Sequence, residues 1–196
     1  MVLAELKSAT AAHHARVEAA MPSLDEMATH RGYAATLRAL HGFHRAWEPA
    51  IWATPGVMEA GLGADRRKLP LLERDLRALN LRPLPLRAPR PAPAGAAEAL
   101  GALYVLEGAT LGGRVIHRRI AGPLGITPAR GGAYYHGYGE ETGPAWKTFG
   151  QALERWAERT GEGARIVAGG VACFAALEAW LATPGVLEPP ALRAAS

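Results

Sequence analysis

Near the start of the chain, two histidines and a glutamate have the types and spacing of a metal-ligand set. His14 and Glu18 are four residues apart, so a helix places them on one face and the carboxylate can orient the imidazole. Such a partner fixes the tautomer of the imidazole and raises its basicity, which favours metal binding. His13 flanks the same apolar face, and periodicity does not choose between the two histidines. His44 and Glu48 repeat the spacing, and a histidine beside an apolar face is usually a core residue.

The second unusual feature is an apolar helical segment, residues 103–116, that carries glycines in its interior. Each interior glycine costs about 1 kcal/mol relative to alanine. Gly101, Gly108 and Gly112 fall within about 40° of one another on a helix, so they form a stripe without side chains. Either a neighbouring helix packs closely against this stripe, or a flat ligand lies across the bare backbone. The glycines alone leave both interpretations open.

The elements that must position these residues are expected to be helices. Alanine and arginine are frequent, runs of β-branched residues are few, and apolar residues recur at helical spacing. We therefore predict an all-α chain with a single domain over residues 1–196. The predicted helices cover residues 3–21, 25–52, 66–79, 96–120, 145–159 and 163–182.

Turn and capping residues mark the expected ends of these helices. Ser23 and Glu26 have the spacing of a capping box. Repeated prolines predict a surface linker at residues 82–94, and the tail at residues 184–196 is left unassigned. A break, kink or boundary is expected at the following glycines and prolines: Gly32, Pro49, Pro70, Gly122, Pro123 and Pro144.

Composition excludes several classes of function. The net charge of +4 suits an anionic ligand or an acidic partner, but the chain lacks the dense basic patch of a nucleic-acid-binding protein. Phosphate-binding loops, dinucleotide fingerprints and zinc-protease signatures are absent. A single cysteine, Cys173, allows no internal disulfide, and the first residues do not have the pattern of a signal peptide, so we expect a cytoplasmic protein. The apolar run around Cys173 ends at Glu178 and is expected to be too short for a membrane span.

Two segments together resemble heme oxygenases. Residues 6–18, LKSATAAHHARVE, are similar to the amino-terminal helix of that family, in which a threonine precedes the proximal histidine by four positions and a glutamate follows it by four. The resemblance therefore implies that His14 is the axial ligand, with Thr10 and Glu18 beside it. Residues 104–113, YVLEGATLGG, resemble the distal helix. Residues 138–146, YGEETGPAW, further resemble the bacterial enzymes associated with bacteriophytochromes.

The resemblance implies a heme oxygenase fold, with heme between the proximal and distal helices. Gly108 and Gly112 would let the backbone approach the heme, leave room for O2 and limit which meso carbon is attacked. Lys7 and Lys147 would contact the propionates. The implied reaction cleaves heme to biliverdin, CO and iron, using O2 and electrons from an external reductase or ferredoxin. A bacteriophytochrome that receives biliverdin is a further implied partner, whereas nucleic acid and membrane are not expected.

One departure from the family pattern concerns proton supply. Many heme oxygenases have an aspartate directly after the first distal glycine, and this chain has Ala109. Thr110 could hold a water molecule instead, or an acid could come from another helix. Without either, a non-catalytic heme-binding or carrier protein on the same fold is the alternative. More distant alternatives are a thiamin-hydrolysing enzyme of related architecture and a di-iron oxidase, for which only Glu26 with His30 offers a fragment of a site.

Overall fold

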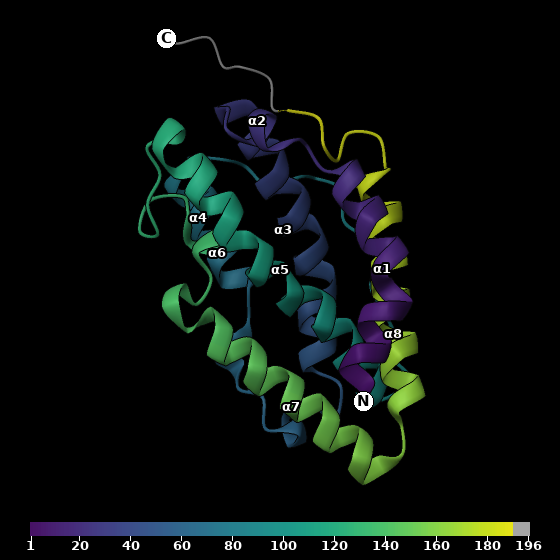
Figure 1. Ribbon diagram of the computed structural model, residues 1–196. Helices are drawn as coiled ribbons and strands as arrows, with labels where there is room; N and C mark the ends of the chain where they lie inside the picture. The colour runs from purple at the N-terminus through teal and green to yellow at the C-terminus, as the bar shows by residue number, and fades with distance from the viewer. Residues whose placement is uncertain (190–196) are drawn as a thin grey trace, which may run out of the picture.

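The computed structural model describes residues 1–189, which form eight α-helices and three short 3-10 helices without a β-strand (Figure 1). The predicted all-α fold is therefore confirmed. The α-helices are α1 (Val2–Ala20), α2 (Leu24–Met27), α3 (His30–Trp52), α4 (Leu69–Ala78), α5 (Ala96–Leu124), α6 (Ala133–His136), α7 (Thr142–Thr160) and α8 (Gly163–Leu181). The 3-10 helices are η1 (Met58–Ala60), η2 (Ala64–Arg66) and η3 (Gly139–Glu141).

Capping groups define the junction between α2 and α3. The predicted capping box forms, because the Ser23 hydroxyl accepts from the Glu26 amide while the Glu26 carboxylate accepts from the Ser23 amide. The expected break near Gly32 lies slightly earlier. Thr29 caps α3 by accepting a hydrogen bond from the Gly32 amide at 3.1 Å, so Gly32 is already inside the helix.

Prolines end fewer helices than predicted. Helix α3 continues through Pro49 to Trp52, the end predicted for this stretch, and Ile51 and Trp52 pack into the core. Pro70 begins α4 instead of interrupting a helix, since a first-turn residue needs no amide hydrogen. Two further boundaries also moved: α5 runs through Pro123 and ends at Gly125, whose φ is 60°, and α7 begins at Thr142, before Pro144.

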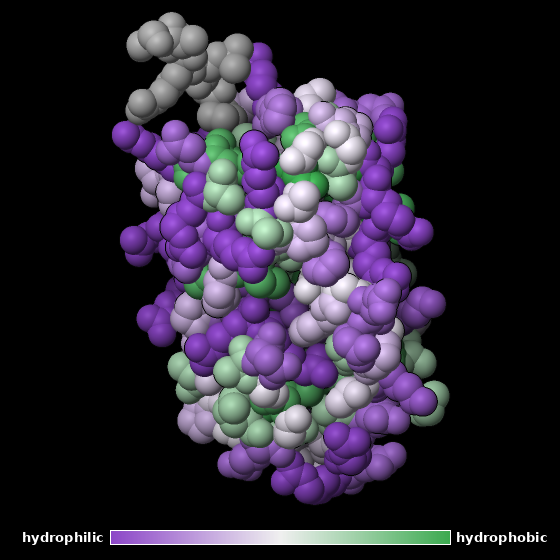
Figure 2. Space-filling view, turned by 90° about the vertical axis from the view of Figure 1, so that its left-hand side faces the viewer, coloured by the Kyte–Doolittle hydropathy of each residue, from purple (hydrophilic) through white to green (hydrophobic). Residues whose placement is uncertain are grey.

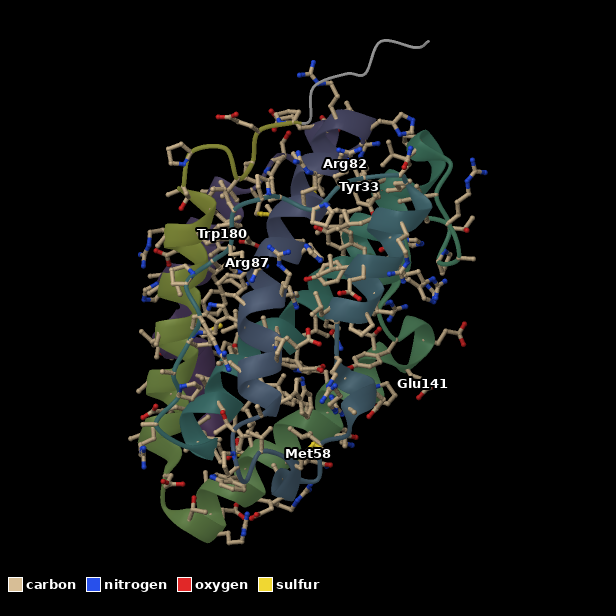
Figure 3. The ribbon with its side chains drawn as sticks, turned by 180° about the vertical axis from the view of Figure 1, so that it is seen from behind. Tyr33, Met58, Arg82, Arg87, Glu141 and Trp180 are labelled. Carbon is tan, nitrogen blue, oxygen red and sulfur yellow. The ribbon has the colours of Figure 1, made fainter. Side chains whose placement is uncertain are left out.

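Helix α8 packs against both α1 and α5, and glycines allow the close approach (Figure 1). A Cβ on Gly101 of α5 would overlap the Ile166 carbonyl of α8. A Cβ on Gly170 of α8 would lie only 2.6 Å from Leu6 of α1. Helix α8 also meets α3, where the indole of Trp180 (labelled in Figure 3) donates to the Ala39 carbonyl at 2.8 Å. Thus α8 holds α1 and α5 at fixed positions within the fold.

Helices α5 and α8 have the length and the apolar composition that a membrane-spanning helix needs. The prediction that the run around Cys173 is too short was therefore wrong, because α8 extends for 19 residues and includes Glu178. The two helices pack against each other, and much of each is buried inside the protein. A core helix passes the same test, so their apolar character is weak evidence for a membrane span.

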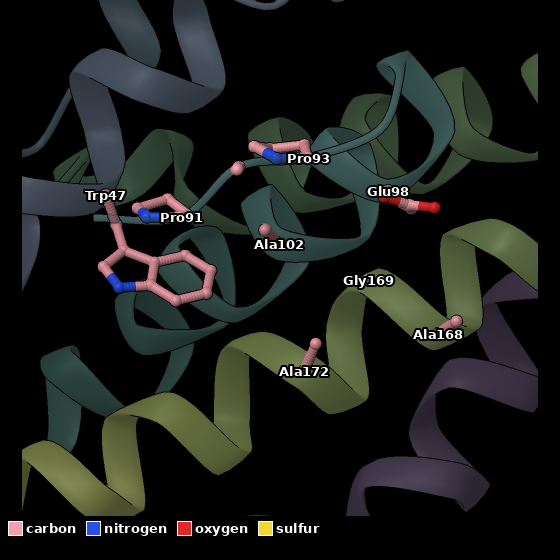
Figure 4. Close-up of a pocket in the computed structure, with 9 residues that line it drawn as sticks. Trp47, Pro91, Pro93, Glu98, Ala102, Ala168, Gly169 and Ala172 are labelled. Atoms are coloured by element: carbon pink, nitrogen blue, oxygen red, sulfur yellow. The ribbon is translucent and has the colours of Figure 1, made fainter. Parts of the chain in front are cut away.

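The proline-rich segment crosses the surface as predicted, with neither helix nor strand at residues 81–95. Near its end, Pro91 and Pro93 lie over an apolar groove of about 300 Å³ (Figure 4). Trp47 forms one end of this groove, and Ala102 of α5 and Ala172 of α8 line it. The segment thereby brings the chain to the start of α5.

Hydrophilic side chains cover most of the face on the left of Figure 1, and its apolar side chains form small separate groups (Figure 2). The described chain exposes few large apolar residues. Two of them, Leu111 and Val115, are 41% and 54% exposed and lie on α5, directly before and shortly after Gly112 and Gly113. The middle of α5 therefore presents an apolar surface to solvent.

Candidate functional site

A cavity of about 380 Å³ lies between α1, α5 and α8. Its size is within the range of ligand-binding pockets. Helix α1 contributes one wall and α5 another, while side chains from α6, α7 and α8 complete it. The wall residues on α1 are His14, Val17, Glu18 and Met21, and those on the middle of α5 include Tyr104, Gly108, Ala109, Leu111 and Gly112. The other main contributions are Tyr134, Tyr135, Trp146, Phe174 and Leu177.

The glycines of α5 serve two different purposes. Gly101 fits against α8, as described above, whereas Gly108 and Gly112 line the cavity. A Cβ on Gly112 would meet nothing within 4 Å, and one on Gly108 would meet only the Trp146 ring, at 3.9 Å. Helix packing therefore accounts for one end of the stripe, and the other end is open toward a space that can hold a ligand.

His14 points one ring nitrogen at Glu18 and leaves the other available. The distance from Nδ1 to Glu18 Oε2 is 3.4 Å, and the ring stands edge-on to Phe174 with the centroids 5.9 Å apart. The side chain is 58% exposed, and its ring makes no hydrogen bond within residues 1–189. The predicted pair therefore lies at the cavity, and Nε2 has no hydrogen-bond partner within residues 1–189.

His13 has a different neighbour. Its Nδ1 is hydrogen-bonded to the Glu178 carboxylate on α8, and Arg16 Nε donates to the same carboxylate at 2.9 Å. These hydrogen bonds, chiefly the one from Arg16, lower the pKa of Glu178. His13 does not line the cavity, so the geometry separates two histidines that periodicity could not.

Four other predicted site residues lie away from the cavity wall. Thr10 is buried and donates to the Leu6 carbonyl of its own helix at 2.6 Å. Thr110 is buried on the far side of α5, where its hydroxyl donates to the Glu107 carbonyl at 2.6 Å. The two predicted lysines, Lys7 and Lys147, are both exposed. Among the described residues, no lysine or arginine lines the cavity.

Behind the wall formed by α6 lies a buried hydrogen-bonded series that the sequence analysis did not identify. The Tyr134 hydroxyl is 3.3 Å from His44 Nε2, and His44 Nδ1 is 3.0 Å from Glu48 Oε2. The same Glu48 oxygen accepts from the amides of Lys68 and Leu69, at 3.0 and 2.9 Å. Glu48 Oε1 is buried and has no partner within the described chain. The spacing of His44 and Glu48 was noted, but only the fold brings Tyr134 to them.

Helix α6 is held in place by a buried carboxylate. Asp75 of α4 accepts hydrogen bonds from the amides of Ala133 and Tyr134, both at 2.8 Å. Burial raises the pKa of Asp75, and these two hydrogen bonds partly oppose that effect. The Tyr33 hydroxyl also donates to the Gly131 carbonyl at 2.6 Å. The aromatic wall that α6 presents to the cavity is therefore rigidly supported.

The di-iron alternative finds no site in residues 1–189, where no three histidine, cysteine, aspartate or glutamate side chains are grouped closely enough to hold a metal ion. Glu26, one half of the suggested fragment, is exposed and forms the capping box with Ser23. The carboxylate thus caps a helix at the surface and does not point into the helical core.

Comparison with known proteins identifies the family. A heme oxygenase from Xanthomonas campestris pv. campestris (strain 8004) is 34% identical over 154 residues, which cover 76% of this chain and 88% of the relative. The chain belongs to the heme oxygenase family. The crystal structure of the NO- and CO-bound heme oxygenase from Neisseria meningitidis matches the fold with a TM-score of 0.80, at 21% identity and over 97% of both chains. No family model matches the chain.

These comparisons confirm the heme oxygenase fold and identify the protein as an enzyme that binds and degrades heme. The residues that bind heme in this heme oxygenase, and its assignment to the bacteriophytochrome-associated branch, remain predictions.

Proposed function

We propose that heme binds in the cavity between α1 and α5, with His14 Nε2 as the axial ligand and Gly108 and Gly112 over the opposite face. The observation that supports this most is that one cavity contains both an imidazole with a free nitrogen and a helix whose backbone lacks side chains. The remaining walls are mainly aromatic and aliphatic, as suits a flat apolar macrocycle.

The neighbouring residues have complementary roles in this arrangement. Glu18 accepts the hydrogen from His14 Nδ1, which keeps Nε2 unprotonated for the metal. Gly108 and Gly112 admit O2 and restrict its direction of attack, because the backbone itself forms that wall. Heme supplies the redox-active iron and is also the substrate. The proposed overall reaction converts heme and O2 to biliverdin, CO and iron, with electrons from an external reductase or ferredoxin.

Protons need a source other than residue 109, which is alanine in this chain. We infer that the series of Glu48, His44 and Tyr134 is the proton source, an acid from another helix that meets the cavity wall at Tyr134. The hydrogen-bond distances of 3.3 and 3.0 Å support this arrangement. As a proton source Thr110 has less support, because its hydroxyl donates a hydrogen bond to the Glu107 carbonyl on the far side of α5.

The propionates are expected at the mouth of the cavity, where exposed cations can pair with them. Lys147 follows Trp146, which lines the cavity, and is the better placed of the two predicted lysines. Lys7 lies two helical turns before His14, about 10 Å along α1. Both assignments remain proposals, as do Thr10 beside the proximal ligand, a cytoplasmic location and biliverdin supply to a bacteriophytochrome.

A hemin titration followed by aerobic reduction with ascorbate tests this function. We expect wild type and His13→Ala to bind one hemin per chain and to yield the absorption spectrum of biliverdin. His14→Ala should lose the spectrum of the histidine-ligated complex. Equal binding by wild type and His14→Ala would refute the proposed ligand. Tight binding without biliverdin, even with a protein reductase, would favour the non-catalytic carrier.

A further inference from the structure

A buried cluster of charged side chains lies directly behind the glycines of α5. At its centre is Glu107, which is 1% exposed and immediately precedes Gly108. Lys68 Nζ donates to Glu107 Oε1 at 3.1 Å, and the Tyr138 hydroxyl donates to the same oxygen at 2.8 Å. Arg66 lies 3.4 Å from the second oxygen. We refer to these four side chains as the Glu107 cluster.

The Glu107 cluster joins three separate segments to α5. Lys68 also donates to the Arg66 carbonyl at 3.0 Å and contacts the Tyr138 hydroxyl, and Arg66 donates to the Ala145 carbonyl of α7 at 3.1 Å. Burial lowers the pKa of Lys68, although Glu107 opposes that effect. None of the four residues lines the cavity, so their role must be exerted through the helix that carries Glu107.

The positions of the residues on α5 explain why this segment needs an anchor. Glu107, Thr110 and Gly113 are buried and share the face turned away from the cavity, whereas Gly108 and Gly112 lie on the cavity side. Glycines give the helix conformational freedom and no side chains for packing. From residue 107 to 113, Glu107 is the only side chain with a hydrogen bond to another element of the described structure. It therefore fixes the bare segment to the rest of the fold.

Stability alone does not explain a cluster of this kind. Removing charges from water is unfavourable, and well-packed apolar residues of similar volume often replace a buried ion pair without loss of stability. Charged and hydrogen-bonded groups do, however, permit only a narrow range of geometries. A cluster that fixes one geometry is useful where a small displacement of backbone changes the outcome of a reaction.

We propose that Glu107 is a positioning residue that determines which meso carbon of heme is oxidised. It acts by fixing the distance and rotation of the Gly108–Gly112 backbone relative to the bound macrocycle. Without this anchor, the segment samples several positions and more than one meso carbon becomes accessible. This inference rests on the proposed placement of heme against Gly108 and Gly112.

The test combines two measurements on Glu107→Gln. In the ligand-free protein, amide hydrogen exchange of the peptide covering residues 106–114 should become about tenfold faster, because local opening is easier. In the hemin complex, chromatography of the biliverdin product should change from one dominant isomer to a mixture. Lys68→Arg, which retains a cation beside Glu107, should keep the dominant isomer, whereas Lys68→Met should resemble Glu107→Gln.

Two further variants keep the test decisive if Glu107→Gln does not fold. Tyr138→Phe removes one neutral donor and leaves both cations in place, and the double variant Glu107→Leu/Lys68→Met removes the Lys68–Glu107 ion pair while Arg66 keeps its hydrogen bond to the Ala145 carbonyl. Each is expected to give a mixture of isomers. A folded variant with wild-type exchange and a single isomer would overturn the proposal. Failure of the heme placement itself would be seen separately, as hemin binding that does not depend on His14.

Discussion

Gly101 and Gly112 lie on one stripe of α5 but face different surroundings. A methyl group on Gly101 would overlap the Ile166 carbonyl of α8, whereas one on Gly112 would project into open space in the cavity. The same substitution should therefore affect folding at one position and ligand binding at the other.

Gly112→Ala is expected to stabilise the ligand-free protein by about 0.5–1 kcal/mol, because alanine favours helix more than glycine. Its methyl group should weaken hemin binding about tenfold, which corresponds to roughly 1.4 kcal/mol. Urea denaturation and hemin titration measure the two effects. Gly122→Ala is the matched control, since a Cβ there also meets nothing within 4 Å and Gly122 lies outside the cavity. Equal hemin affinity in the two variants would contradict the proposed site.

Gly101→Ala should destabilise the fold by about 2–4 kcal/mol, because the new methyl group meets backbone atoms that no rotamer change can move. Urea denaturation of the ligand-free protein measures this change. A loss below about 0.5 kcal/mol, the usual range for surface substitutions, would show that α5 and α8 separate easily.

Glu18→Gln should weaken hemin binding by about tenfold, because the amide holds His14 Nδ1 less firmly than a carboxylate. Glu5→Gln is the control on the same helix, since Glu5 is exposed and lies outside the cavity. Equilibrium titrations followed by absorption should separate the variants. If both bind hemin as wild type does, Glu18 does not support the ligand.

Tyr134→Phe should slow biliverdin formation by about 10- to 100-fold, a typical loss when a proton donor is removed. Hemin affinity should change little, because the phenyl ring remains in the wall. Tyr135→Phe is a close control, since the Tyr135 hydroxyl makes no hydrogen bond within residues 1–189. Single-turnover measurements test this expectation, and wild-type rates in Tyr134→Phe would exclude it as the proton donor.

The stability of the ligand-free protein should fall as the pH decreases from about 6.5 to 4. Burial, assisted by the nearby charges of Arg45 and His44, lowers the pKa of His41 to about 4. The unfolded chain therefore binds a proton at His41 before the folded protein does, and that proton favours unfolding. The loss should approach about 2–3 kcal/mol. Urea denaturation at pH 7 and 4.5 should show it, and His41→Gln should retain less of this pH dependence.

Local patterns predicted the elements of the fold well. The capping box at Ser23, the extent of the first helix and the proline-rich linker all depend on residues close in sequence, so their positions were clear. Pro70 shows where this reasoning failed, because it lies in the first turn of a helix instead of interrupting one. The length expected for the apolar run around Cys173 was also too short, because the helix continues past Glu178 to Leu181.

The site was predictable only where one helix contains both partners. His14 and Glu18 satisfy this condition, and so do Gly108 and Gly112. By contrast, the contact between Tyr134 and His44 joins residues that are 90 positions apart. The division of the glycine stripe likewise depends on where α8 packs. Such pairings follow from the tertiary fold, and no spacing in the sequence reports them.

The glycines of α5 make the stability of this protein depend on its own substrate. An apoprotein whose longest helix is weakened by glycines gains stability from any ligand that fills the neighbouring cavity. With heme in this cavity, as proposed, catalysis destroys the ligand, so each turnover returns the enzyme to its less stable form. Resistance to cellular proteases should therefore follow the supply of heme, so that more enzyme persists when more heme is present.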